Sequence, residues 1–323
     1  MATRSEAGVW VSGHLYFAGE MYGAPCDRMI LEVAAPFIGR AETEGWIDGS
    51  FFIRFRDTGP HVRLRVHTVG DGLDAVVREA FVAHARTIWP EVTVGDAPPV
   101  ATGRQPGEVL SIRWLPYIAE EERYGGRAGV SVAERVFAAS SRAACGLLRK
   151  IDPALRDSRL GKALLAMLVL IHAVAPDAAA AAGFADVYSS ANLRIFAREE
   201  GASVHWSGAF DAAYARQAET LGEYVIETWT RLLTRDPVIP ELDRYREDLA
   251  DPVDALLALA ATGSLRQYGG RVTAPGEVLR RIVPSYVHMM NNRLGVTIQE
   301  EAYLAYLIRR ALSAPRLASV SER

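Results

Sequence analysis

The stretch SFFIRFRDTGPHVRLRV, residues 50–66, predicts a β-hairpin around which the rest of the chain is organised. Apolar and polar residues alternate on both sides of residues 57–60, a run of turn-forming residues. With these four residues as the loop, Arg54 faces Arg63 and Phe52 faces Arg65. Successive side chains on a strand point to opposite faces, so one face gathers the cationic residues and the other forms a core surface. The cationic face carries Arg54, Arg56, His61, Arg63 and Arg65.

Like charges that face each other in an antiparallel pair destabilise it, so this clustering of arginines needs an explanation. Three explanations remain open: the side chains extend into water, carboxylates from elsewhere neutralise them, or the face binds an anion. Arginine suits the third, because its planar guanidinium holds a carboxylate or phosphate with two parallel hydrogen bonds. Against it, nearly all the positive charge of this chain is arginine, with lysine only at 150 and 162.

The bulk composition is that of a soluble globular protein, with half of the 323 residues hydrophobic. The formal net charge of −3 argues against a general nucleic-acid binder, which is usually basic. Two cysteines provide neither a disulfide framework nor a zinc set, and they fit a reducing cytoplasm. The first ten residues lack an apolar signal core, and the longest apolar run is too short to span a bilayer. We therefore expect a cytoplasmic protein with no membrane partner and no direct nucleic-acid partner.

Hydrophobic periodicity predicts a β-α-β-β-α-β order over the first 120 residues and mostly helices afterwards. Residues 92–108 are predicted to be a loop, 178–182 a helix end or loop, and 236–251 a surface connection. Ser131 and Glu134 have the spacing of a capping box. The fold class is α+β, with a mixed or antiparallel β layer and flanking helices followed by a mostly helical part. We expect a single domain over 1–323, with a β-rich sub-region 1–128 and a helical sub-region 129–323. The later helices are predicted at 159–175, 209–234, 252–262, 275–293 and 299–313.

A second group of functional candidates lies in PSYVHMMNNRLG, residues 284–295. His288 and Asn292 are four residues apart on a predicted helix and share a face. A histidine titrates in the range that proton transfer needs, although a lone histidine on a helix is more often structural. Ser285 follows a proline and fits a helix N-cap as well as a nucleophile. No metal-binding or nucleotide-binding motif is present.

Taken together, these stretches resemble the C-terminal domain of class I lanthipeptide dehydratases, in the stand-alone form of thiopeptide and related ribosomal-peptide antibiotic pathways. The resemblance runs in the family's order from position 50 to 312. It is carried by residues 50–66, YIAEEERYGG at 117–126, AERVFAASS at 133–141, SYVHMMNNRLGV at 285–296 and EEAYLAYLIRRAL at 300–312.

The resemblance implies elimination of glutamate from glutamylated Ser or Thr of a precursor peptide, which leaves dehydroalanine or dehydrobutyrine. The family's elimination residues correspond to Arg63, Arg65, Glu120, Arg123 and His288. Elimination needs a cationic clamp for the departing glutamate, a base for the Cα proton and a stabiliser for enolate-like charge. Arg63 and Arg65 fit the clamp, Arg123 oriented by Glu120 fits the stabiliser, and His288 fits the base. We predict that Arg63, Arg123 and His288 line one cleft and that the reaction needs no cofactor and no metal.

Other stand-alone members of this family are pyridine synthases, which join two dehydroalanines in a formal aza-[4+2] cycloaddition and release the leader peptide. Ser285, Tyr286 and His288 fit the proton transfers of that reaction. The segment before Ser140-Ser141 lacks the acidic residue usual in elimination-type members, which keeps this alternative open. A third interpretation is a non-catalytic scaffold that binds the leader peptide. The expected partners are the precursor peptide with its leader and a glutamyl-tRNA-dependent glutamylating protein. A homodimer stays open. Beyond the clamp, the substrate-binding candidates are Arg54, Arg56, His61, Ser285, Tyr286 and Asn292.

Overall fold

The computed structural model describes residues 8–89, 91–95, 110–197 and 202–313. The chain divides into two compact units. Unit 1 is built from Met1–Glu120, Phe137–Pro153 and Asn292–Gly295, and unit 2 from Glu121–Val136, Ala154–Asn291 and Val296–Arg323. The first unit contains a five-stranded sheet with flanking helices and the second is mostly helical, which confirms the predicted α+β class.

Unit 1 is organised around a five-stranded sheet in the order β2-β3-β1-β5-β4. Neighbouring strands are antiparallel except for β4 and β5, which are parallel. The strands are β1 (Trp10–Phe17), β2 (Ile47–Phe55), β3 (His61–Thr68), β4 (Val92–Val94) and β5 (Leu110–Trp114). Strand β4 lies within the predicted loop 92–108, and the rest of that loop from residue 96 on lies outside the described residues.

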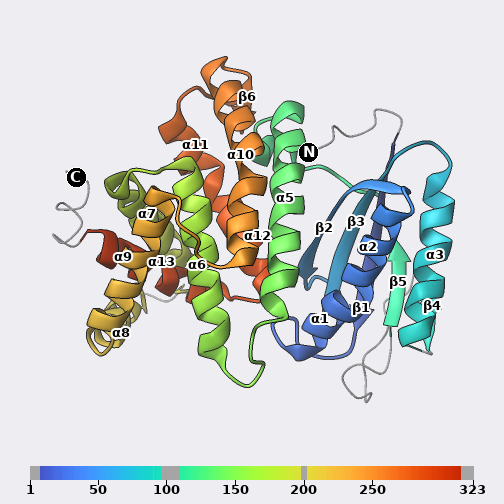
Figure 1. The fold of residues 1–323 in the computed structure, drawn as a ribbon, viewed down its shortest axis with the longest axis horizontal. Helices are drawn as coiled ribbons and strands as arrows, with labels where there is room; N and C mark the ends of the chain where they lie inside the picture. Colours follow the sequence, from blue (N-terminus) through green and yellow to red (C-terminus); the bar gives the residue numbers. More distant parts are fainter. Residues whose placement is uncertain (1–7, 90, 96–109, 198–201, 314–323) are drawn as a thin grey trace. The chain divides into compact units, whose positions relative to one another are not determined.

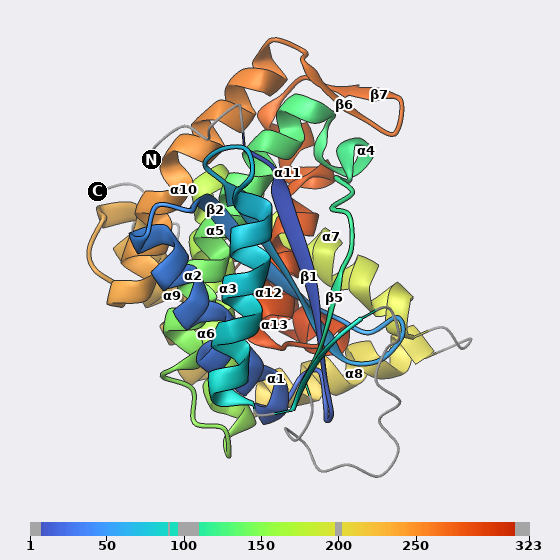
Figure 2. The ribbon, with the colours of Figure 1, turned by 90° about the vertical axis from the view of Figure 1, so that its right-hand side faces the viewer.

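One face of this sheet is covered by the helices that connect its strands (Figures 1 and 2). A continuous helical segment follows β1, and its central turn is π-helical; α3 follows β3. Phe37 and Phe81 meet edge-to-face between the helices at a centroid distance of 4.9 Å, and both are almost fully buried. The bounds of these elements are α1 (Ala24–Arg28), η1 (Met29–Ala34), α2 (Ala35–Thr43) and α3 (Leu73–Ile88).

The register of the β2–β3 hairpin differs by one residue from the prediction. The loop has five residues, 56–60, so Arg54 pairs with Val62, Ile53 with Arg63, and Phe51 with Arg65. Because side chains alternate along a strand, this shift moves Arg54 to the face opposite Arg63 and Arg65. Both faces of the hairpin therefore mix apolar and cationic residues, and the predicted separation into a core face and a cationic face was wrong.

Unit 2 is a helical assembly in which α13 packs against α7, α9 and α6, and α10 packs against α6. A two-stranded hairpin, β6 (Leu265–Gln267) with β7 (Gly270–Val272), contacts the short helix α4 (Glu121–Tyr124). The longer helices are α6 (Arg156–Val174), α7 (Ala178–Phe196), α8 (Ala202–Ala215), α9 (Ala218–Thr234), α10 (Pro240–Ala261), α11 (Pro275–Arg281), α12 (Val283–Leu294) and α13 (Ile298–Leu312). Helices α5 (Arg127–Leu148) and α12 contribute residues to both units.

Several local predictions are corrected here. Helix α5 begins at Arg127, so Ser131 lies inside it and forms no capping box at its start. A capping box is present instead at Thr297 and Glu300, at the start of α13. The alanine tract begins helix α7, and most of the predicted connection 236–251 is the first part of α10. Among the described residues, no helix is both long enough and apolar enough to cross a membrane.

Candidate active site

Around Arg63, the sheet face opposite Arg54 gathers three arginines and two histidines of unit 1; a third histidine, His67, lies farther from the hairpin loop and contacts Asp48 at 2.7 Å. The strand pairing places Arg63 of β3, His14 of β1 and Arg113 of β5 side by side in one row. The row toward the hairpin loop holds His61 and Tyr16, and the row on the other side holds Arg65. These residues come from three strands; Arg63, Arg65 and His61 were predicted to share a face, whereas His14 and Arg113 were not among the candidates.

Arg63 is held by contacts on two sides. Its Nη2 donates to Asp57 Oδ2 at 2.9 Å, and its Nε donates to His61 Nε2 at 3.3 Å. The guanidinium carbon lies 3.4 Å from the centroid of the Phe55 ring, a cation–π contact. Partial burial lowers the pKa of Arg63, and the charges of Asp57 and Glu120 oppose this effect. The guanidinium is therefore oriented in advance and lies within the electrostatic reach of Glu120.

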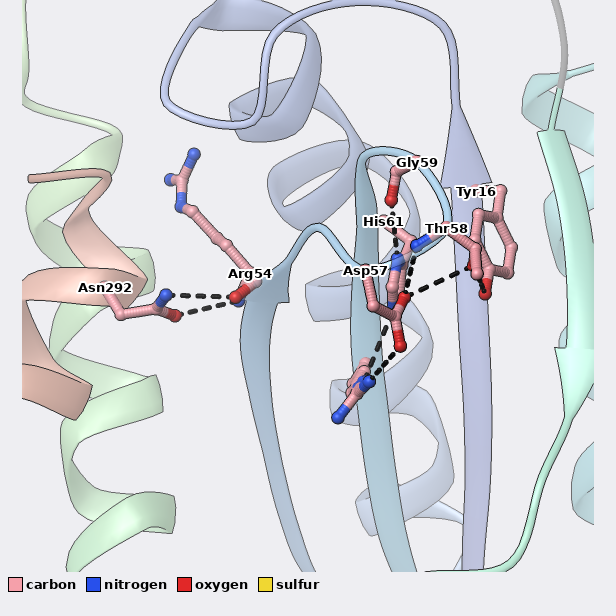
Figure 3. A network of polar contacts seen from close by, with 8 residues as sticks. Tyr16, Arg54, Asp57, Thr58, Gly59, His61 and Asn292 are labelled. Atoms are coloured by element: carbon pink, nitrogen blue, oxygen red, sulfur yellow. Dashed lines mark hydrogen bonds and ion pairs between the residues drawn. The ribbon is translucent and has the colours of Figure 1, made fainter. Parts of the chain in front are cut away.

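The two histidines beside Arg63, namely His61 and His14, are uncharged at neutral pH. His61 donates from Nδ1 to the carbonyl of Gly59 at 2.8 Å, which leaves Nε2 to accept from Arg63 (Figure 3). Burial lowers the pKa of His61, and the charge of Arg63 adds to that effect. His14 stacks on His61 with ring centroids 5.1 Å apart. Burial and the charge of Arg63 lower the pKa of His14 to about 3. The positive charge of the face thus comes from its arginines.

Arg65 is stacked between aromatic side chains. Its guanidinium carbon lies 4.8 Å from the ring centroid of Tyr117 and 5.3 Å from that of Phe51. Like Phe55 below Arg63, these rings hold a planar guanidinium in place through its apolar faces. Arg63 and Arg65 are thus fixed in orientation on one face of β3, which is the arrangement a carboxylate clamp needs.

Arg54 and Asn292 are held in contacts of their own in unit 1. Arg54 is 1% exposed, and its Nη2 donates to Asp27 Oδ1 at 2.6 Å. The amide of Asn292 accepts from the backbone N–H of Arg54 at 2.9 Å and donates to its carbonyl at 3.0 Å (Figure 3). Ser141 Oγ likewise accepts from the backbone N–H of Phe52 at 3.2 Å. These contacts indicate that Arg54 and Asn292 support strand β2. Arg56 is exposed in the hairpin loop.

In unit 2, His288 is paired with a buried carboxylate. Its Nδ1 lies 2.9 Å from Oε1 and 3.3 Å from Oε2 of Glu301, which is fully buried. The hydroxyl of Tyr188 donates to the same carboxylate, and burial together with the Glu301 charge raises the pKa of that phenol. The His288 side chain is 36% exposed. A buried carboxylate on Nδ1 fixes the tautomer and orientation of the imidazole and directs Nε2 to proton transfer.

Glu301 and Tyr188 were not among the predicted site residues. Glu301 had a recognisable signal, because it lies on the apolar face of α13 with Leu304 and Ile308, where a carboxylate is rare unless it is paired. Tyr188 had none, since the segment around it was not assigned to a helix. Helix α7 brings it to Glu301, and Ser189 adds a hydrogen bond to the carbonyl of Ala302 at 2.8 Å.

The remaining candidates of unit 2 lie in different environments. Tyr286 is 2% exposed, its ring stacks on Tyr124 at 5.8 Å, and burial raises the pKa of its phenol. Ser285 is partly exposed. Arg123 lies in α4, where its carbonyl accepts from Gln267 at 2.8 Å.

The candidates belong to two units. Arg63, Arg65 and Glu120 lie in unit 1, whereas Arg123 and His288 lie in unit 2. The predicted orientation of Arg123 by Glu120 and the predicted common cleft therefore stay predictions. Among the described residues, no group of three or more His, Cys, Asp and Glu is arranged to hold a metal ion.

Comparisons with known proteins bear on the family. Residues 10–312 match the family described as the C-terminal part of lantibiotic biosynthesis dehydratases. The pyridine synthase TbtD from thiomuracin biosynthesis is 20% identical, with a TM-score of 0.66 over 94% of this chain and 97% of that chain. TsrL is 18% identical, with a TM-score of 0.65 over 94% of this chain and 93% of that chain.

A third solved structure is that of the tRNA-dependent lantibiotic dehydratase MibB from Microbispora sp. 107891. It is 20% identical, with a TM-score of 0.56 over 100% of this chain and 29% of that chain. At these identities, the three structures show a shared fold. The comparison with curated protein sequences gives no match. Because the family match covers nearly the whole length, this chain belongs to the lantibiotic biosynthesis dehydratase C-terminal family.

Proposed function

We propose that this protein eliminates glutamate from glutamylated Ser or Thr residues of a ribosomally made precursor peptide. The single observation that carries the proposal is the cationic sheet face of unit 1, where Arg63 and Arg65 are held in place by Asp57 and by aromatic rings. Elimination expels an anion, and oriented guanidiniums stabilise a departing carboxylate. The product would be dehydroalanine or dehydrobutyrine, and a glutamyl-tRNA-dependent partner would supply the ester.

The proposed reaction moves one proton and one electron pair. A base takes the Cα proton, the C–H electrons form the Cα=Cβ double bond, and the Cβ–O bond breaks so that glutamate leaves with the electron pair. His288 is the proposed base, because Glu301 holds its Nδ1 and stabilises the imidazolium that forms. Arg63 and Arg65 are proposed to bind the departing carboxylate. Arg123 and Glu120 stay the proposed pair for the enolate-like charge.

Pyridine formation is the second candidate, because TbtD, a pyridine synthase, aligns over 97% of its own length with this fold. Ser285 and His288 are partly exposed and suit the proton transfers of a cycloaddition. Tyr286 suits them less, because its phenol is buried against Tyr124 and its pKa is raised. The cycloaddition expels water and a leader peptide amide, so it has no use for a carboxylate clamp. This difference favours elimination.

The test is mass spectrometry of two peptides incubated with the purified protein alone. One peptide carries a glutamyl ester on serine, and the other carries a leader and two dehydroalanines flanked by azoles. We expect loss of glutamate from the first peptide by the wild type and by Arg86→Ala, a variant of an exposed arginine in α3. We expect no loss with His288→Ala or Arg63→Ala.

Two other outcomes would reject elimination. A pyridine macrocycle with a released leader from the second peptide would identify a cyclase. Binding of both peptides without any change in mass would identify a leader-binding scaffold, and Arg63→Ala would then weaken binding itself.

A further inference from the structure

The row Arg63, His14 and Arg113 contains one cation that the clamp described above leaves unused. Arg113 pairs in register with His14, which pairs on its other side with Arg63. Neighbouring strands lie about 4.8 Å apart, so the Cα atoms of Arg63 and Arg113 are roughly 10 Å apart. Flexible arginine side chains span that separation around a ligand with two anionic groups.

The polar atoms of this row are only partly satisfied. Arg63 has Asp57 as its ion-pair partner, whereas Arg113 forms no ion pair within the described ranges. The Nε of Arg113 and the Nδ1 of His14 are both buried and have no hydrogen-bond partner in that part of the chain. His14 is 7% exposed. A buried donor without a partner costs about 1–3 kcal/mol of folding free energy. A bound ligand that accepts hydrogen bonds from Arg113 and His14 would remove this cost.

The charge pattern of the face matches an amino acid with two carboxyl groups. Arg113 at one end and Arg63 with Arg65 at the other provide two cationic positions. Asp57 accepts from Arg63 at 2.9 Å, and the charge of Glu120 also acts on that guanidinium, so carboxylates that can meet an ammonium group lie near Arg63. A glutamyl ester has one free carboxylate and one ammonium, and its second carboxylate forms only as the ester bond to the serine breaks.

We infer that Arg113 and His14 bind the free carboxylate of the glutamyl group, so that the cationic face selects a dicarboxylate leaving group rather than any ester. This inference rests on the proposed elimination and deepens it. The carboxylate that is present throughout meets Arg113 and His14, and the one that develops in the reaction meets Arg63 and Arg65. A leaving group with a single carboxylate fills only half of the site.

Isothermal titration calorimetry of the full-length protein tests the inference without turnover. The probes are L-glutamate, glutarate, which lacks the ammonium, and 4-aminobutyrate, which lacks one carboxylate; sulfate is the simple anion. We expect the wild type to bind glutamate and glutarate about 10-fold or more tightly than 4-aminobutyrate or sulfate. Arg113→Gln should reduce the affinity for both dicarboxylates about 10-fold or more. It should weaken the binding of 4-aminobutyrate as well, because that probe keeps only the side-chain carboxylate of glutamate, the one that is free in the ester.

Three further variants complete the design. Arg86→Gln makes the same charge change at an exposed position of α3 and should bind like the wild type. His14→Gln should weaken dicarboxylate binding, and Arg113→Lys, which keeps the charge without the planar fork, should bind with intermediate affinity. Near-ultraviolet circular dichroism checks the fold of each variant. If Arg113→Gln does not fold, the two single variants Arg113→Lys and His14→Gln test the inference.

Different results distinguish failure of the inference from failure of the proposed function. If the wild type releases glutamate from the glutamyl peptide but Arg113→Gln binds dicarboxylates as the wild type does, the inference is wrong and elimination stands. Equal affinity of the wild type for sulfate and glutamate also overturns it, because the face is then a simple anion site. If the wild type neither binds glutamate nor releases it from the peptide, both proposals fail.

Discussion

Glu301 is the group that holds the imidazole of His288 in unit 2, through a hydrogen bond of 2.9 Å to Nδ1. We expect Glu301→Gln to reduce kcat for elimination by roughly 100-fold with little change in KM, because a neutral amide orients the ring but stabilises the imidazolium less. The acidic limb of the pH–rate profile should move to lower pH, since removal of a nearby negative charge disfavours the protonated ring.

The matched control for this prediction is Glu247→Gln, at an exposed position of α10. It should leave kcat, KM and the pH profile as in the wild type. A merely structural role for Glu301 would lower stability without moving the pH profile, so an unmoved acidic limb in Glu301→Gln would contradict the assignment.

His14 makes the stability of the protein sensitive to acid. Its pKa is about 3 in the folded state, against 6.5 for an unperturbed histidine, so the unfolded chain binds more protons between these values. The free energy of unfolding is therefore fully retained above pH 6.5 and falls by about 1.4 kcal/mol per pH unit toward pH 3. His14→Gln should remove this part of the acid dependence, a difference of about 2 kcal/mol at pH 5 relative to neutral pH.

Urea unfolding of both proteins at pH 7 and pH 5 measures that difference. The neighbouring charges of Arg63, Arg65, His61 and Asp57 remain in the variant. Other histidines with lowered pKa values, among them His61 and His84, contribute equally to the acid dependence of both proteins. An equal loss of unfolding free energy between pH 7 and pH 5 in both proteins would contradict the prediction that protonation of His14 destabilises the folded state.

At the scale of the element, strand β2 depends on Asn292. The Asn292 amide satisfies both backbone groups of Arg54, and both residues are buried. Asn292→Ala leaves a buried N–H and a buried carbonyl without these partners, and we expect a loss of about 2–4 kcal/mol in the free energy of unfolding. Urea denaturation provides the measurement. A loss below about 0.5 kcal/mol, as for an ordinary surface substitution, would show that water replaces the amide.

The elements that sequence predicts well are those with strong periodicity. Leu73–Ile88 is the second helix of the predicted β-α-β-β-α-β order, and β1 and β5 are its first and last strands. The hairpin register was not predictable, because residues 53–56 alternate isoleucine or phenylalanine with arginine and 61–66 alternate equally well in two registers. Only the five-residue loop decides between them. It depends on Gly59, whose φ of 122° lies outside the range that L-residues favour.

The candidate site divides in the same way. Arg63, Arg65 and His288 could be proposed from sequence because they fall in motifs. Arg113 and His14 become neighbours only through strand pairing, and Glu301 meets His288 only through helix packing. Helix α7 was missed because an alanine tract without a periodic pattern begins it. Its N-cap was visible in sequence, since Asp177 precedes the tract and accepts from the N–H of Ala180 at 2.7 Å.

At the scale of the whole molecule, unit 1 is not a contiguous stretch of chain. It takes Phe137–Pro153 and Asn292–Gly295 together with the first 120 residues. We expect a fragment of residues 1–120 to be poorly folded, because it lacks Ser141, which accepts from Phe52, and Asn292 and Arg293, which pair with Arg54. Dispersion of amide signals in a ¹H–¹⁵N NMR spectrum is the measurement. A dispersed spectrum with cooperative unfolding would contradict this prediction.

Strand β2 is an edge of the five-stranded sheet. An edge strand usually presents backbone groups that another strand can join, which is a route both to aggregation and to peptide capture. Here Ser141 accepts a hydrogen bond from the N–H of Phe52, and the Asn292 amide accepts from the N–H of Arg54 and donates to its carbonyl. These side chains take the place of a sixth strand at two successive outward-facing positions. Edge-to-edge association of two copies through this part of β2 is therefore blocked, and no added strand can extend the sheet there without first displacing both side chains.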